Sequence, residues 1–242
     1  MKKFLPIIIL FLGALVLVGV FFFLRSRNSD SGDGEESVPV VAFADRPVTT
    51  LTPSEDGHWL KLKVEKIKIK AKTLDYELLY ELPSGNTQGV PGTVDLGSTK
   101  SLERDLLLGS ESSGKFRYDE GVKAGTLTLR FRNEKGKLTA KFTTPFSLLS
   151  ETKELASSDE KFKLTLNKSS DAFFVVMETF GAPEGYPSGI TAGPYGVFSA
   201  SEDVSGVVSL GSGSLQGYFS GDWAKLESGK SQNLGIFVLT SE

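Results

Sequence analysis

The pattern of hydrophobic and polar positions divides the chain into an unbroken apolar run, a polar stretch and a long region of alternation. Phe4 to Leu24 is a run of 21 residues without a charge. A helix of that length spans roughly 30 Å, the thickness of a bilayer core. Pro6 falls in the first turn, where no intrahelical N–H bond is lost. The sequence therefore predicts one transmembrane helix within residues 1–25.

A cleaved secretory signal is the alternative, because Lys2 and Lys3 also resemble the start of one. The apolar run, however, is longer than a signal core and ends in Phe21–Leu24 before Arg25, without the small residues of a cleavage site. We therefore expect a retained anchor. The two lysines and the terminal amine outnumber Arg25 and Arg27 by one charge, and the N-terminal tail is short. Both features favour a cytoplasmic N-terminus and an extracytoplasmic remainder.

Residues 26–37, SRNSDSGDGEES, contain no apolar side chain. Such a segment cannot bury a core and behaves as a flexible coil with an end-to-end distance of roughly 20 Å. We expect a linker that holds the rest of the chain near the bilayer.

Period-two alternation dominates from residue 38 onward and predicts strands. Leu60, Leu62 and Val64 alternate with lysines until the phase slips at Glu65–Lys66, which predicts a bulge. The pattern then continues through residues 67–71 and 74–82. A hairpin turning at Lys72–Thr73 would place these two segments side by side. In that register Ile69 faces Tyr76, Ile67 faces Leu78, Lys70 faces Asp75 and Lys68 faces Glu77.

A second hairpin is marked more clearly. Residues 127–132 and 138–142 alternate on either side of the turn from Asn133 to Gly136, and glycine at the end of this turn suits a left-handed backbone.

The last third shows alternation at Phe162, Leu164 and Leu166, and a continuous apolar run over 172–177 that predicts a strand covered on both faces. Short apolar segments follow at 197–198, 207–210, 218–219 and 236–239. The polar stretch 151–160 is the candidate domain boundary. We predict an all-β fold of tandem Ig- or fibronectin-like β-sandwiches, 38–150 and 151–242. The alternative is one larger, continuous sandwich or barrel.

Composition narrows the function. The net charge of −3 divides into about +3 over residues 38–150 and −6 over 151–242, so neither half is basic enough to suggest nucleic acid. Without cysteine there is no disulfide framework or thiolate chemistry, and with one histidine the usual zinc sites are excluded. We predict no cofactor, no metal and no catalytic residue from any local motif.

Basic residues form two candidate surfaces. Six lysines between Lys61 and Lys72 suggest contact with an anionic polymer or lipid headgroups, but the predicted hairpin pairs two of them with acids and favours a solvated face. The second hairpin predicts an outer face that meets phosphate, carboxylate or an acidic partner, including the acidic half of this chain. Its residues are Arg130, Arg132, Lys135, Lys137 and Lys141. A plain soluble surface is the alternative for both.

Aromatic residues supply the other candidate. The segment 181–200 holds Tyr186, Tyr195 and Phe198 among glycines and prolines, as in loops that bind sugars or peptides or that cap a core. Trp59 and Trp223 are expected in the core, and His58 on ordinary surface.

These features favour a non-enzymatic, membrane-anchored envelope protein with a binding or structural role. Its partners would be the bilayer, through Phe4 to Leu24, and an envelope polymer or protein. The alternative is an anchored carbohydrate- or peptide-active hydrolase that uses carboxylates. Acidic side chains converging in a deep cleft would favour the enzyme, and filled cores with shallow surfaces would favour the module.

Overall fold

The computed structural model describes residues 38–201 and 204–241, and within them the fold is all-β, as predicted. The predicted anchor and linker lie outside the described residues. No helix in the described part of the chain is long and apolar enough to cross a membrane. The described residues include two single-turn 3-10 helices, η2 (Phe43–Asp45) and η3 (Glu227–Gly229).

We refer to residues 39–150 and 151–241 as the first and second halves. The strands of the first half are β1 (Val48–Pro53), β2 (Trp59–Glu65), β3 (Thr73–Glu81), β4 (Thr87–Asp95), β5 (Leu102–Leu107), β6 (Gly109–Ser112), β7 (Lys115–Tyr118), β8 (Ala124–Arg132) and β9 (Leu138–Leu149). The strands of the second half are β10 (Thr152–Ala156), β11 (Lys163–Ser170), β12 (Phe174–Glu178), β13 (Ile190–Ser199), β14 (Gly206–Ser209), β15 (Ser214–Phe219), β16 (Asp222–Lys225), β17 (Lys230–Ser231) and β18 (Ile236–Thr240).

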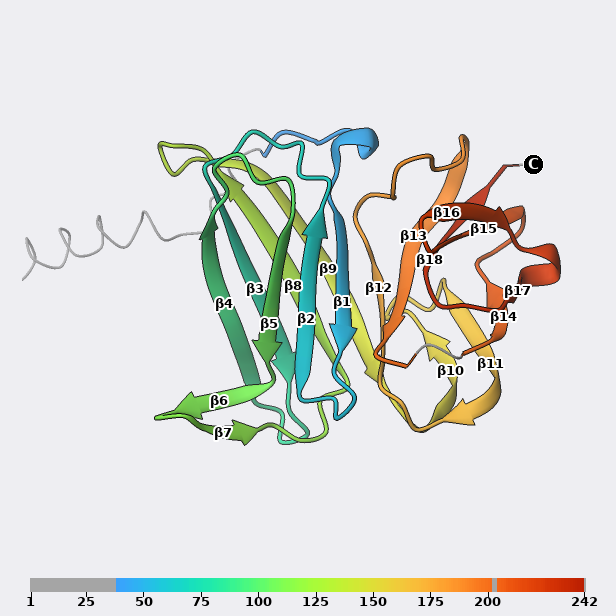
Figure 1. The fold of residues 1–242 in the computed structure, drawn as a ribbon, viewed down its shortest axis with the longest axis horizontal. Coiled ribbons are helices and arrows are strands. Elements are labelled where there is room, and N and C mark those ends of the chain that lie inside the picture. The colour runs from blue at the N-terminus through green and yellow to red at the C-terminus, as the bar shows by residue number, and fades with distance from the viewer. Residues whose placement is uncertain (1–37, 202–203, 242) are drawn as a thin grey trace, which may run out of the picture. The chain divides into compact units, whose positions relative to one another are not determined.

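One sheet runs through both halves. Its nine strands follow the order β16-β15-β18-β13-β12-β9-β8-β3-β4, and antiparallel pairing of β12 with β9 joins the halves (Figure 1). The sheets β1-β2-β5 and β10-β11-β14-β17 are smaller, and β6 and β7 form a separate hairpin.

Each smaller sheet covers one part of the long sheet and encloses a core. The first core contains buried residues of β2, β3, β5, β8 and β9, and the second contains buried residues of β11, β12, β13, β14 and β18. Strand β12 serves both, because Val175 and Met177 belong to the first core while Phe174 and Val176 belong to the second. The apolar run predicted to be covered on both faces is therefore confirmed, and its two faces belong to different cores.

The predicted hairpin at Lys72–Thr73 is wrong. Strand β2 ends at Glu65, and Lys66 has a left-handed φ of 56°, so the phase slip marks the end of the strand and not a bulge within it. Residues 66–72 form no strand. The partners of β3 are β4 and β8, which place Tyr76 beside Gly92 and Leu129 instead of Ile69.

The second hairpin is confirmed. Strands β8 and β9 pair with Phe131 opposite Ala140 and Leu129 opposite Phe142, and Gly136 has a φ of 74° in the connecting turn. The polar stretch 151–160 contains β10, in which Leu155 is fully buried.

Candidate functional site

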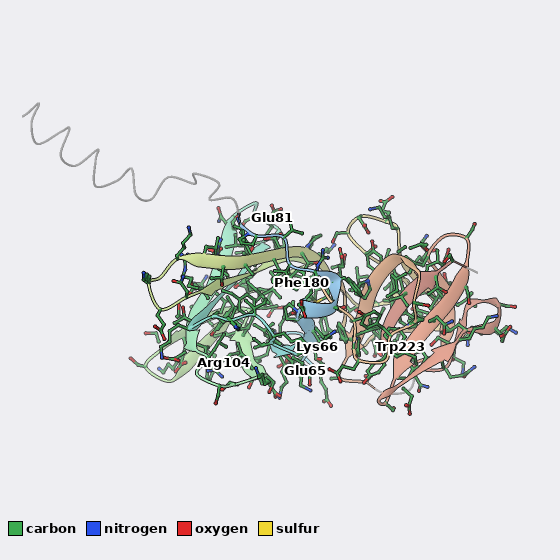
Figure 2. The ribbon with its side chains drawn as sticks, turned by 90° about the horizontal axis from the view of Figure 1, so that it is seen from above. Glu65, Lys66, Glu81, Arg104, Phe180 and Trp223 are labelled. Carbon is green, nitrogen blue, oxygen red and sulfur yellow. The ribbon has the colours of Figure 1, made fainter. Side chains whose placement is uncertain are left out.

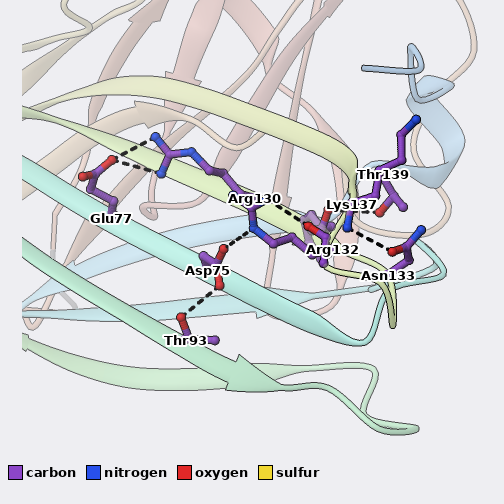
Figure 3. Close-up of polar contacts among 10 residues, drawn as sticks. Asp75, Glu77, Thr93, Arg130, Arg132, Asn133, Lys137 and Thr139 are labelled. Atoms are coloured by element: carbon purple, nitrogen blue, oxygen red, sulfur yellow. Dashed lines mark hydrogen bonds and ion pairs between the residues drawn. The ribbon is translucent and has the colours of Figure 1, made fainter. Parts of the chain in front are cut away.

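The basic face of the second hairpin carries its own counter-charges, because β3 lies beside β8. Arg130 Nη1 and Nη2 both donate to Glu77 Oε2 at 3.0 Å, and Arg132 Nε donates to Asp75 Oδ2 at 2.7 Å (Figure 3). The acids that the sequence assigned to Lys68 and Lys70 are thus partners of these two arginines. Strand register places Lys141 opposite Arg130.

The remaining cations of that face are exposed. Lys135 and Lys137 lie in and just after the turn, where their backbone N–H groups donate to Asn133 Oδ1 at 3.0 Å. The structure therefore brings the five predicted residues onto one hairpin but pairs its two arginines with acids of β3.

The three residues of the predicted aromatic loop do not share one loop. Ile190–Ser199 is β13, which contains both Tyr195 and Phe198. Tyr195 is buried in the second core and its hydroxyl donates to Asp159 Oδ2 at 2.7 Å, whereas Phe198 packs against the first core. Only Tyr186 lies in a loop, with its ring edge-on to Phe43 at 5.3 Å. The apolar segment 197–198 predicted part of this strand, but glycines and Pro194 around Tyr195 interrupt the pattern, so its extension back to Ile190 was missed.

A different group of rings is exposed at the start of β2. The β6–β7 hairpin carries Phe116 and Tyr118 on one side, with 46% and 38% of their surfaces exposed. Tyr118 stacks on His58 at 4.2 Å between ring centroids, and Phe116 meets the edge of Trp59 at 5.6 Å. We call these four residues the aromatic patch. Trp59 thus belongs to a surface and not to the core, contrary to our expectation.

Local backbone features position the patch. Leu108 N donates to His58 O at 2.8 Å and Asp119 N donates to Leu108 O at 3.0 Å, so the hairpin is fixed to the start of β2. Its turn has positive φ at Ser113 (52°) and Gly114 (75°), typical of a tight hairpin turn. The hairpin extends beyond the β1-β2-β5 sheet (Figure 1).

Carboxylates surround His58. Asp56 Oδ2 lies 3.1 Å from His58 Nδ1, and Glu120 Oε1 lies 3.3 Å from Nε2. Hydrogen bonds from the Ser54 hydroxyl and then from the His58 backbone N–H lower the pKa of Asp56 to about 2. An adjoining pocket of about 350 Å³ is lined by Asp56, His58, Asp119 and Glu120, and by apolar residues including Phe173.

Two of the carboxylates of this pocket are hydrogen-bonded within the protein. Asp56 is held as an anion, which makes it a hydrogen-bond acceptor and not an acid. Asp119 accepts a hydrogen bond from the Tyr80 hydroxyl at 2.9 Å. No group of three or more His, Asp or Glu side chains in the described ranges is arranged to hold a metal ion.

The sequence contained one unused signal for this site. Lys115-Phe116-Arg117-Tyr118 alternates directly after Ser113-Gly114, which is a turn dipeptide. That signal predicts a hairpin but not its neighbours, since His58 and Trp59 are more than fifty positions away.

Comparisons with protein-family models, with curated proteins and with solved structures found no match.

Proposed function

We propose that this chain is a membrane-anchored, extracytoplasmic protein that binds a carbohydrate polymer of the cell envelope through its aromatic patch. The observation that carries the proposal is the contact of four rings, Phe116, Tyr118, Trp59 and His58, at an exposed position. The C–H faces of sugar rings pack on aromatic rings, and their hydroxyls donate to carboxylates such as Asp56 and Glu120. Backbone hydrogen bonds hold the β6–β7 hairpin against the start of β2, and this fixed placement of the rings favours a binding module.

Two further parts of the proposal rest on the sequence and the fold. The apolar run Phe4 to Leu24 supports the anchor, and the weak charge bias supports an N-terminus in the cytoplasm. Each core lies between two sheets, which supports an Ig- or fibronectin-like sandwich in residues 38–150 and another in 151–242, joined through β12.

Sedimentation with purified envelope polysaccharide tests the binding site. Residues 39–242 form one compact unit, so a chain beginning at Val38 can be used. We expect the wild type to sediment with the polymer, and the double variant F116A/Y118A to bind at least tenfold more weakly, because truncating central aromatic contacts costs about 2 kcal/mol or more. Val207, 43% exposed on β14, provides the matched control V207A. Equal sedimentation of both variants would contradict the proposal.

Cell fractionation tests the anchor separately. The full chain should remain with membranes after a high-salt wash, and external protease should degrade it without detergent. Protection until detergent is added would reverse the proposed orientation, and release into the soluble fraction would indicate a cleaved or absent anchor.

A carboxylate hydrolase is the second candidate, because Asp56, Asp119 and Glu120 line one pocket with His58. The hydrolase hypothesis predicts that the protein releases soluble fragments from the polymer and that E120Q abolishes this release. The binding proposal predicts that no fragments appear on prolonged incubation, although the protein is bound.

A further inference from the structure

A groove separate from the aromatic patch lies between the two halves. Its volume is about 750 Å³, within the range of roughly 300–1,000 Å³ of small-molecule sites. One wall comes from β1 and the segment after β2, and the other from β13, β15 and the start of β18. Backbone hydrogen bonds from Thr49 N to Thr179 O (3.1 Å) and from Gly181 N to Pro47 O (3.0 Å) join the halves beside it. The groove is therefore built into a fixed interface.

The lining is largely apolar. Its hydrophobic side chains are Val48, Ile67, Phe198, Phe219, Leu234 and Ile236. Most of them also contact one of the two cores, so the wall is held in place by packing. Val48, Ile67 and Ile236 are almost fully buried, so an apolar chain placed here would mainly cover the partly exposed side chains Phe198, Phe219 and Leu234.

The groove also contains charged groups. Lys66, Lys68 and Lys100 line it together with Glu65 and Glu184. Glu65 already forms an ion pair with Lys63, at 2.9 Å. Because the predicted hairpin is wrong, Lys68 is not neutralised by Glu77, which instead accepts hydrogen bonds from Arg130. Three lysines and two glutamates give the lining a small formal excess of positive charge, although Glu184 acts on Lys66.

Lys66 is the most constrained of these lysines. It has a left-handed φ of 56°. This backbone conformation is unfavourable for any residue other than glycine. Its Nζ donates to Ala182 O at 2.9 Å and lies 5.3 Å from the Tyr186 ring centroid. Burial, followed by the charge of Lys68, lowers its pKa. Figure 2 shows Glu65 and Lys66 where the first half meets the second.

We propose that this groove binds a single-chain amphiphile with an anionic head, specifically a long-chain carboxylate. The apolar wall takes the chain, and Lys66, Lys68 and Lys100 take the carboxylate. A hydrophilic anion would leave the apolar wall in water, and a neutral lipid would leave the lysines without a counter-charge. A carbohydrate matches neither the apolar wall nor the lysines of the groove, so this site is independent of the aromatic patch.

Fluorescence titration with cis-parinaric acid, an 18-carbon carboxylate, tests the proposal on a chain beginning at Val38. We expect saturable binding that oleate displaces and that oleyl alcohol displaces at least tenfold less effectively. The double variant K68Q/K100Q should weaken binding fivefold or more, and L234Q should weaken it through the apolar wall. K153Q and L79Q alter an exposed lysine of β10 and an exposed leucine of β3, both outside the groove, and should bind as the wild type does.

An absence of saturable binding, or equal affinity in K68Q/K100Q, L234Q and the two controls, overturns the proposal. Equal displacement by oleate and oleyl alcohol would contradict the claim that the groove selects an anionic head group. Far-ultraviolet circular dichroism checks that each variant is folded, and K68Q/K100Q changes only groups at the surface, so loss of binding in that variant is not loss of the fold.

Discussion

Asp159 closes the turn between β10 and β11 and connects it to the second core. Its carboxylate accepts hydrogen bonds from the hydroxyls of Ser157 (2.6 Å) and Tyr195 (2.7 Å). Partial burial acts to raise the pKa of Asp159, but these hydrogen bonds prevail and lower it to about 2. The Asp159 side chain thereby stabilises the turn and provides a hydrogen-bond acceptor for the hydroxyl of the buried Tyr195.

The lowered pKa makes a prediction about stability against pH. Because the folded-state pKa lies below the ordinary value of 3.8, the contribution of Asp159 is present above about pH 4 and is lost as the pH falls towards 2. At pH 7 we expect D159N to lower stability by about 1 kcal/mol, discounted for partial exposure.

Thermal unfolding at several pH values measures this effect. The difference between wild type and D159N should be full at pH 7 and should narrow between pH 4 and pH 2. E160Q, an exposed change in the same turn, should unfold as the wild type does. A constant difference down to pH 2 would show that Asp159 does not act through its charge.

Gly125 in β8 illustrates a second requirement at single-residue scale. A methyl group at this position would overlap the backbone oxygen of Leu79 and the ring of Phe146. We expect G125A to destabilise the protein by about 2 kcal/mol or more, because neither backbone nor core ring can move freely. In the edge strand β4, the nearest atom to a methyl group at Gly89 would be a flexible side-chain atom, Leu79 Cδ2, at 3.0 Å.

Chemical denaturation of G125A and G89A compares the two sites directly. The midpoint of G125A should fall well below that of G89A. Similar midpoints would mean that β3 and β8 pack less tightly than the structure indicates.

At the scale of strands, the pairing of β3 with β8 sets the charge of the basic hairpin, because β3 places acids beside its two arginines. The Arg130–Glu77 pair is partly exposed, 29% and 33% for the two side chains, so we expect a coupling energy of about 0.5–1 kcal/mol. A double-mutant cycle with R130A and E77A measures it, and the coupling should decrease in high salt.

The same pairing bears on the anionic-partner hypothesis. If that face bound an acidic envelope polymer, R130E/R132E would abolish a salt-sensitive interaction. From the ion pairs with Glu77 and Asp75 we expect no such loss, and K135E/K137E, which changes two exposed lysines of the same hairpin, controls for the charge left after pairing. A loss in R130E/R132E would favour the anionic partner.

Sequence patterns located strands better than they paired them. The β8–β9 hairpin was predictable because its turn chemistry and both alternating flanks are contiguous. The Ile67–Ala71 segment alternates equally well, yet Lys66 turns the chain and β3 pairs with strands farther along the sequence. Alternation reports which side chains can be buried, and only tertiary packing selects the neighbour.

The candidate site was less predictable than the fold. Trp59 and His58 precede Phe116 and Tyr118 by more than fifty residues, and they meet because Leu108 bonds to both His58 and Asp119. The predicted aromatic loop shows the opposite case, in which residues close in sequence do not form one site. Tyr195 is close to Tyr186 in sequence but is buried in a strand.

For the molecule as a whole, sharing of β12 predicts joint unfolding. Val175 and Met177 complete the first core while Phe174 and Val176 complete the second. Loss of either half would expose one face of β12, so we expect one cooperative transition for residues 38–242 and poor folding of fragments 38–150 and 151–242.

Circular dichroism and tryptophan fluorescence followed in the same denaturant series check this coupling. Coincident curves support it. Two separated transitions, or a soluble folded fragment 38–150, would show that the halves are autonomous domains.

The central claim is that the aromatic patch contacts the envelope polysaccharide, and Trp59 can report on it directly. The chain has two tryptophans, so W223F leaves Trp59 as the single emitter. Titration of this variant with soluble oligosaccharides released from the polysaccharide should give a saturable blue shift as sugar displaces water from the ring, and Y118A should abolish it. Trp59 emission that stays unchanged while the protein still sediments with the polymer would contradict the account.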